Sequence, residues 1–294
     1  MTFKEKYTIL ASLSNQKKRK FSEVYTCEDS STKERLVLKQ VMKNQHNTLE
    51  QDRLRSEASF SFQKEGLPVI CDFFEDENSI QVVKKYEAGI PLNEFLSDLT
   101  PRKRRTVLGQ LLPLIADLLG NIHKQKILHL DIKPSNILVA KLENTYRVAL
   151  IDFGMAIRMD QFETRKTLFP LGYAAPELVL NQLHCCDKTS DYFSLGITIW
   201  HCLTGKLPLY HSNPSIFTNL QINHPLPESS LIPKKQHEIL AKLCAKYSFE
   251  IPPNHLSETE MIKRLNEGKK ERYQDLTDFN NAWNESIHRK WWQF

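Results

Sequence analysis

The ten residues His129–Leu138 constrain the possible folds of this chain more than any other segment. They read His-Leu-Asp-Ile-Lys-Pro-Ser-Asn-Ile-Leu, so an aspartate, a lysine and an asparagine are spaced among apolar residues. Sixteen residues past Asn136 comes Asp152-Phe153-Gly154, directly after the apolar run Val148–Ile151, which predicts a short strand. Asp152-Phe153-Gly154 alone would be a weak signal, and its order and spacing relative to His129–Leu138 make it more specific.

Two further segments complete the series. Ala175-Pro176-Glu177 comes next, followed by Asp191-Tyr192-Phe193-Ser194-Leu195-Gly196. In this order the four segments resemble the catalytic loop, the metal-binding turn, the end of the activation segment and the buried central helix of the eukaryotic-type serine/threonine protein kinases. The resemblance extends over nearly the whole chain, from about Tyr7 to Trp283.

Length and composition agree with a globular enzyme. The chain has 294 residues, enough for one large domain or two packed lobes, and 40% of them are apolar. The formal net charge of +5 is too small to indicate a dedicated nucleic-acid binder. No run reaches the ~18 uninterrupted apolar residues of a membrane helix. We therefore expect no nucleic-acid partner and no membrane span.

The cysteines and the first residues of the chain give an indication of the cellular compartment in which the protein is found. None of the six cysteines forms a C-x-x-C pair, so a zinc site is not expected, and their scatter favours a reducing cytoplasm. The charged start Met-Thr-Phe-Lys-Glu-Lys has no apolar segment behind it and does not resemble a secretory signal. The sequence therefore predicts a cytoplasmic protein.

Hydrophobic patterns predict a strand-rich part followed by a helix-rich part. Strands are expected at Tyr7–Leu13, Phe21–Cys27, Arg35–Val41, Val69–Phe74 and Ile80–Tyr86, with one helix at Asn47–Gln63. Helices are then expected at Leu92–Ser97, Arg102–Lys124, Asp191–Leu203 and Gln236–Lys246. The character changes near residues 86–90, which is a candidate lobe boundary.

This order predicts an α+β architecture with two lobes. The resemblance implies one protein kinase domain over residues 1–294. Its N-lobe, about 1–86, would be a small antiparallel β-sheet with one helix. A hinge at about 85–90 would lead to a larger, mainly helical C-lobe at about 90–294.

The resemblance also implies roles for the residues of the central segments. Asp131 would orient the substrate hydroxyl and accept its proton. Lys133 would neutralise the γ-phosphate of ATP. Asn136 and Asp152 would supply oxygen ligands to Mg²⁺, a hard cation that prefers them. Such residues suit phosphoryl transfer, because that reaction depends on in-line positioning and cancellation of phosphate charge.

A lysine and a glutamate in the first part of the chain form a candidate ion pair. Lys39 lies within a predicted strand, and Glu57 interrupts the apolar stripe of the predicted helix, where a carboxylate needs a partner. The pair matches the lysine and glutamate that hold the α- and β-phosphates in the family. Glu50 lies on the same helix but comes too early, so we favour Glu57.

Residues around the adenine base follow from the same resemblance. Val24 and Val37 would form the roof of the pocket and Leu138 its floor. The backbone of the hinge Lys85-Tyr86-Glu87 would bind the adenine edge. Lys84 would then occupy the gatekeeper position, where the family usually has an apolar residue or threonine; a shift of one residue would place Val83 there instead. The resemblance also pairs Glu177 with Arg272, and the residues between Ala245 and Lys270 are an expected insertion.

Three departures from the family pattern bear on nucleotide binding and regulation. The phosphate-covering loop contains no glycine, since the first glycine of the chain is Gly66. Four cations, Lys17–Lys20, stand there instead; they are either a solvated turn or a contact to phosphates or an acidic partner. Leu130 replaces an arginine that many kinases pair with an activation-loop phosphate.

Pro170 stands where the family has a threonine that contacts the catalytic aspartate. Thr167 is nearby but does not align with that threonine position.

The sequence therefore predicts an ATP- and Mg²⁺-dependent serine/threonine protein kinase that acts on protein hydroxyls. Lys133 favours serine/threonine over tyrosine specificity. The alternative is a pseudokinase that serves as a scaffold or regulatory binding protein, and the glycine-free loop and Lys84 favour it. A small-molecule phosphotransferase is disfavoured, because such enzymes usually lack the segments at Ala175 and Asp191. A regulatory partner is possible, and Trp291 and Trp292 either pack on the large lobe or meet a partner.

Overall fold

The computed structural model describes residues 2–13, 22–161, 169 and 171–288. Its contacts divide the chain into two units. The first unit comprises Met1–Ala88 and Ala149–Ala156, and the second comprises Gly89–Val148 and Ile157–Phe294. The residues 149–156, which the sequence analysis assigned to the second lobe, therefore have their contacts in the first unit.

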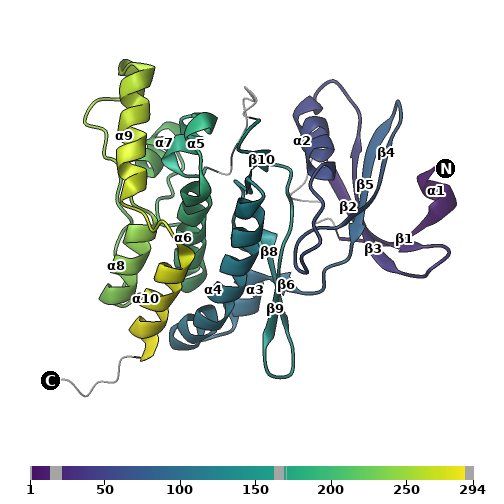
Figure 1. Cartoon of the computed structure of the whole chain (residues 1–294), viewed down its shortest axis with the longest axis horizontal. Coiled ribbons are helices and arrows are strands. Elements are labelled where there is room, and N and C mark those ends of the chain that lie inside the picture. Colours follow the sequence, from purple (N-terminus) through teal and green to yellow (C-terminus); the bar gives the residue numbers. More distant parts are fainter. Residues whose placement is uncertain (1, 14–21, 162–168, 170, 289–294) are drawn as a thin grey trace. The chain divides into compact units, whose positions relative to one another are not determined.

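The first unit is built on one antiparallel sheet (Figure 1). Its five strands lie in the order β1 (Tyr7–Ser12), β2 (Ser22–Asp29), β3 (Arg35–Met42), β5 (Ser79–Lys85) and β4 (Ile70–Glu75). All five match strands expected from the hydrophobic pattern, with ends that differ by one or two residues. The α+β fold with a small antiparallel sheet is confirmed.

Each face of this sheet has its own apolar cluster, because successive side chains of a strand point to opposite faces. On one face Val41, Ile80 and Val82 pack with Leu54 of helix α2 (Thr48–Ala58). The other face is covered by the one-turn helix α1 (Phe3–Lys6), whose Phe3 belongs to a second buried cluster. That cluster also contains Tyr7, Cys27, Leu36, Leu38 and Val83.

Helix α2 is shorter than predicted, since it ends at Ala58 rather than near Gln63. Phe60 and Phe62 both contact the ring of Phe153, with centroids 6.2 and 5.1 Å away. Two residues that are two positions apart in a helix point about 200° apart, so a helix could not direct both at one ring. The chain therefore leaves the helix, and the Phe62 N–H donates to the Pro68 carbonyl at 2.9 Å.

The second unit is mainly helical. Its helices are α3 (Leu92–Ser97), α4 (Pro101–Lys124), α5 (Pro176–Val179), α6 (Lys188–Thr204), α7 (Pro214–Asn223), α8 (Lys234–Leu243), α9 (Glu258–Lys270) and α10 (Leu276–His288). Short strands lie at β6 (Ile90–Pro91), β7 (Ile127–Leu128), β8 (Ile137–Lys141), β9 (Tyr146–Leu150) and β10 (Ile157–Arg158). Helices α4, α6, α8 and α10 pack against one another (Figure 1).

Helix α6 is the buried central helix that the resemblance implied. Fourteen of its seventeen residues are buried. Asp187 caps its N-terminus by accepting from the Thr189 N–H at 2.8 Å, and Gly205 ends it in the left-handed conformation at φ 79°. A helix that is apolar on all sides is stable only inside a core, so α6 forms the interior support of the second unit.

The expected insertion between Ala245 and Lys270 contains an ordered helix, α9. Its Leu265 packs with Phe249 and Ile222 in a separate apolar cluster. Gly268 lies so close to the backbone of Lys246 and Tyr247 that a Cβ atom there would be 2.9 Å from the Lys246 carbonyl carbon. The segment is therefore a packed part of the second unit.

Several residues singled out in the sequence lie outside the described residues: Lys17–Lys20, Thr167, Pro170, Trp291 and Trp292. Among the helices that the structure describes, none combines the length and the apolar character needed to cross a membrane.

Candidate active site

The first unit brings together Lys39, Glu57 and Asp152. The Lys39 ammonium contacts Glu57 Oε2 at 2.6 Å and Asp152 Oδ1 at 2.7 Å. Strand β3 supplies the lysine, helix α2 the glutamate, and the turn after β9 the aspartate. The predicted pairing of Lys39 with Glu57 rather than Glu50 is confirmed, and Asp152 joins it.

Burial makes these charges depend on one another. The Glu57 side chain is 1% exposed and the Lys39 side chain 13%. Burial alone would raise the pKa of Glu57, but the nearby Lys39 and Lys84 ammonium groups outweigh it and lower that pKa. Burial would likewise lower the pKa of Lys39, but Asp152 and Glu57 outweigh it and raise the pKa. Both groups are therefore charged at neutral pH.

A third element supplies a second cation to Glu57. Lys84 of β5 donates to Glu57 Oε1, and its side chain is 12% exposed. Lys84 lies opposite Val37 in the sheet, on the face that bears Lys39, whereas Val83 points to the opposite face and belongs to the cluster with Phe3. The register therefore places Lys84, and not Val83, beside the ion pair.

The turn that carries Asp152 has an unusual backbone. Asp152 has a φ of 67°, in the left-handed region that non-glycine residues rarely adopt. The buried Phe153 ring, between Phe60 and Phe62, anchors the next position of the turn. Strained conformations of this sort persist only where the surroundings hold them, and they gather at functional sites.

The second unit contains the catalytic-loop residues. The Lys133 ammonium lies 2.7 and 2.9 Å from the two carboxylate oxygens of Asp131. The Asn136 amide donates to the Asp131 carbonyl at 2.9 Å and to its Oδ2 at 2.8 Å. Asp131 is 5% exposed. Lys133 and Asn136 thus hold the carboxylate in one orientation, and Asn136 belongs to the short 3-10 helix Pro134–Asn136.

Helix α6 holds this loop through a buried aspartate. Asp191 accepts the backbone N–H of His129 at 3.0 Å and that of Leu130 at 2.8 Å. Its Oδ2 also lies 2.8 Å from His123 Nε2. Burial would raise the pKa of Asp191, but the contact with His123 outweighs it and lowers that pKa. Leu130 has a φ of 58°, and this strained position is held by the bond from its N–H.

The chemistry of Asn136 fits a magnesium ligand. Its amide nitrogen is used by Asp131, so the orientation of the amide is set and Oδ1 is turned to the other side. Oδ1 accepts a long hydrogen bond of 3.4 Å from the Ser135 hydroxyl. An amide oxygen is a ligand type that Mg²⁺ accepts, and so, in the first unit, is the carboxylate of Asp152.

The residues expected around adenine lie in both units. Val24 and Val37 are half-buried in β2 and β3, where Val24 lies opposite Lys39. The Lys85 N–H donates to the Val69 carbonyl at 3.0 Å, and this bond joins the end of β5 to the start of β4. In the second unit, Leu138 is half-buried in β8 opposite Pro91. Glu87 is half-buried just after β5.

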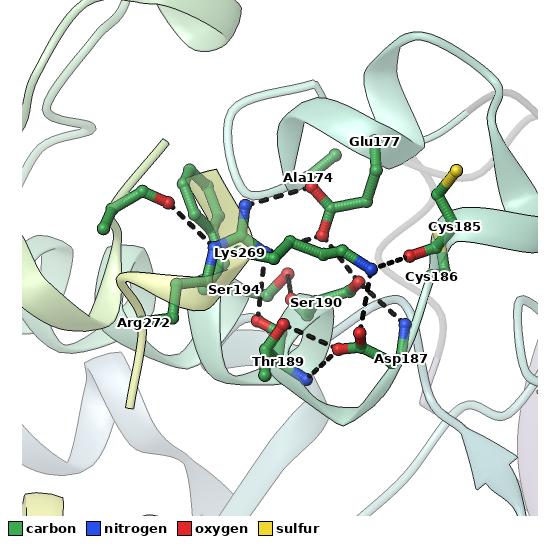
Figure 2. A network of polar contacts seen from close by, with 12 residues as sticks. Ala174, Glu177, Cys185, Cys186, Asp187, Thr189, Ser190, Ser194, Lys269 and Arg272 are labelled. Atoms are coloured by element: carbon green, nitrogen blue, oxygen red, sulfur yellow. Dashed lines mark hydrogen bonds and ion pairs between the residues drawn. The ribbon is translucent and has the colours of Figure 1, made fainter. Parts of the chain in front are cut away.

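The predicted pairing of Glu177 with Arg272 is confirmed, and Figure 2 shows the two side chains within a larger polar network. The two guanidinium Nη atoms lie 2.6 and 3.0 Å from the two carboxylate oxygens. Ser190 of α6 also donates to Glu177, at 2.6 Å. Glu177 is fully buried, and a bidentate pair of this kind fixes both position and angle.

The sequence analysis missed a second ion pair in this network. Lys269 of α9 contacts Asp187 Oδ2 at 2.8 Å and donates to the Cys185 carbonyl (Figure 2). Lys269 is 8% exposed. A lysine in the last turn of a helix usually faces solvent, so nothing in the sequence distinguished it. The pair joins the end of α9 to the cap of α6.

Comparison with known proteins identifies the family to which this chain is similar. The family model described as "Protein kinase domain" matches residues 19–266. The human serine/threonine-protein kinase ULK1 is 32% identical over 158 residues, which are 51% of this chain and 15% of that protein. The serine/threonine-protein kinase PknF of Mycobacterium tuberculosis is 31% identical over a stretch that covers 49% of this chain and 29% of the length of PknF. The serine/threonine-protein kinase PrkC of Bacillus subtilis is 28% identical over a stretch that covers 70% of this chain and 32% of the length of PrkC.

These three relatives are named as serine/threonine-protein kinases, and the chain spans less than a third of the length of each. The family model covers most of the chain, including every catalytic segment that the sequence analysis identified. The chain therefore belongs to the protein kinase domain family.

Proposed function

We propose that this chain is a catalytically active serine/threonine protein kinase that transfers the γ-phosphate of MgATP to hydroxyl groups of a protein substrate. The observation that supports this most is the geometry around Asp131, whose carboxylate is held by both Lys133 and Asn136. A chain that had lost catalysis would have no need to keep these three side chains in mutual contact.

The proposed roles follow from the chemistry of each group. Asp131 accepts the proton of the substrate hydroxyl as the oxygen attacks the γ-phosphorus. Lys133 lies against the same carboxylate, and its charge offsets the negative charge that develops on the transferred phosphoryl group. Lys39 holds the α- and β-phosphates, and Glu57 positions that lysine. Asn136 and Asp152 would each supply an oxygen ligand to Mg²⁺, whose charge would offset that of the phosphates.

Two features favour the alternative, a pseudokinase: Lys84 at the gatekeeper position and the composition of the phosphate-covering segment. The phosphate-covering segment contains no glycine, and glycine is what lets a backbone approach phosphates closely. Against it stand the side chains of Lys39, Glu57, Asp131 and Asn136, which all have the partners that catalysis needs. A cytoplasmic location remains a prediction from the cysteine pattern.

A transfer assay with γ-labelled ATP separates the two functions. The chain is incubated with a generic protein substrate, with and without Mg²⁺, and the labelled residue type is identified afterwards. We expect label on serine or threonine that requires Mg²⁺. Binding of ATP without any transfer would refute the proposal and favour the pseudokinase; label on tyrosine would refute the specificity.

A further inference from the structure

Glu57 is shared between two lysines, one for each of its carboxylate oxygens. Oε2 accepts from Lys39 at 2.6 Å, and Oε1 accepts from Lys84. The two lysines come from β3 and β5, which pair with each other in the sheet. Because Glu57 is 1% exposed, water has little access to its carboxylate and cannot easily replace a missing partner.

Lys39 has a different set of partners from Lys84. Its ammonium contacts Asp152 as well as Glu57, so two of its three N–H groups are in use before any nucleotide binds. The four charged groups, two lysines and two carboxylates, sum to zero. If Lys84 were absent, Lys39 would be the one cation among these groups, between two carboxylates.

A lysine that binds a nucleotide has to balance the charge of Glu57 and contact the phosphates as well. When Lys39 also contacts phosphates, its ammonium is shared among more anions and its bond to Glu57 weakens, and a buried carboxylate is strongly unfavourable when its charge is poorly balanced. A second lysine that stays on Glu57 relieves this demand on Lys39, because the carboxylate keeps a partner throughout. Lys84 has this position, since its side chain is directed at the other oxygen of the same group.

We propose that Lys84 is a positioning residue: it balances part of the Glu57 charge and holds this carboxylate in place, so that Lys39 can stay paired with Glu57 and bind the phosphates of the nucleotide at the same time. The proposal rests on the function proposed above only in taking ATP as the ligand of Lys39. It gives a role to a lysine at a position where an apolar residue or threonine was expected.

The test is a double-mutant cycle on the full chain with Lys84→Met, Glu57→Gln and the combined variant. Dissociation constants for MgATP and adenosine are measured by calorimetry, and KM and kcat by phosphate transfer. We expect Lys84→Met to raise the ATP dissociation constant and KM at least fivefold, because Lys39 then has to balance the Glu57 charge without Lys84 and attracts the phosphates less strongly. Adenosine, which has no phosphates, should bind within twofold of the parent.

The cycle separates positioning from a general loss of structure. In the Glu57→Gln background, Lys84→Met should change the ATP dissociation constant by less than twofold, because the glutamine at position 57 carries no charge that needs a cation. The control Lys43→Met removes a lysine from another ion pair of the first unit, with Glu75 at 2.8 Å, and should change neither ligand's affinity by more than twofold.

Three results would overturn the proposal: an unchanged ATP affinity in Lys84→Met, equal losses of ATP and adenosine affinity, or the same loss with and without Glu57. A parent chain that binds ATP but transfers no phosphate would refute the proposed function alone, because the binding arm still decides the role of Lys84. A parent chain that binds no ATP would refute both.

Discussion

Asp131 is held in its loop by three side chains. Lys133 and Asn136 contact its carboxylate, and its backbone N–H donates to His129 Nδ1 at 3.3 Å. Lys133 supplies a positive charge in contact with this carboxylate.

Replacing Asp131 with asparagine tests its role directly. The variant keeps the shape of the side chain but cannot accept the hydroxyl proton, so kcat should fall on the order of 10²–10⁴-fold. ATP binding should persist, because the groups proposed to hold the phosphates are unchanged. Steady-state transfer and calorimetric ATP binding check this; undiminished transfer would remove Asp131 from the catalytic assignment.

Single residues also show what a sequence can and cannot predict. The ion pair of Lys39 and Glu57 was predictable, because a charge within each apolar pattern needs a partner. The contact of Lys84 with the same glutamate was not, since it depends on the register of β5 against β3. A shift of one residue would have turned Val83 to that face.

Elements were predicted where their pattern is long or strictly periodic. The helix Leu92–Ser97 has the predicted bounds, and the helix predicted from Arg102 begins one residue earlier. Helices α7, α9 and α10 were not predicted, and neither were the one-turn helices α1 and α5. Helix α10 had a signal, because its buried Leu276, Phe279 and Trp283 follow helical spacing. Helix α9 has few buried residues, and its packing depends on contacts with a distant segment.

The close approach of α9 to the segment at Lys246 and Tyr247 leads to a prediction about glycine. A Cβ atom at Gly268 would strike this backbone, which cannot move aside as a flexible side chain can. Gly268→Ala should lower the free energy of unfolding by about 1–3 kcal/mol. The matched control is Gly120→Ala within α4, where a Cβ meets nothing within 4 Å.

The control should act in the opposite direction. Alanine is a better helix former than glycine, so Gly120→Ala should raise the free energy of unfolding by about 0.5–1 kcal/mol. Denaturant unfolding followed by tryptophan fluorescence measures both variants. Equal effects at the two positions would show that the approach of α9 is not tight.

The pair of Glu177 and Arg272 joins α5 to the residue that follows α9 by two positions. Arg272→Met would leave the Glu177 carboxylate buried with the Ser190 hydroxyl but without its cation. We expect a loss of about 3–5 kcal/mol in the free energy of unfolding. The double variant Arg272→Met, Glu177→Met should recover part of it, because no buried charge remains. Urea titration compares the two; a single variant as stable as the parent would contradict the prediction.

Across the whole molecule, buried carboxylates make stability depend on pH. Glu57 in the first unit and Glu177 and Asp191 in the second are all ionised and buried, with lowered pKa values. For Glu177, burial would raise the pKa, but Arg272 outweighs it. When a carboxyl group has a lower pKa in the folded state, the unfolded chain takes up the proton at a higher pH than the folded chain does. The stabilisation of the fold by that group is therefore fully present above the unfolded-state pKa and is lost as the pH falls.

We therefore expect stability to fall as the pH drops below about 4.5, the range in which unfolded carboxyl groups take up protons. Because both units contain such groups, both should lose stability. All four tryptophans lie after residue 199, so their fluorescence reports the second unit, and hydrogen exchange of α2 reports the first. An unfolding free energy that stays constant from pH 7 to pH 3 would contradict this.

The dependence of the catalytic loop on Asp191 also sets an order of events during synthesis. The backbone of His129 and Leu130 is held by a residue 62 and 61 positions further along the chain. At about 5–20 residues per second, a ribosome needs roughly 3–12 s to add that stretch. Until α6 has emerged, the growing chain cannot hold Leu130 in its strained conformation. The geometry of the His129–Leu130 loop is thus acquired late, and a nascent chain cut short before Asp191 lacks the side chain that holds it.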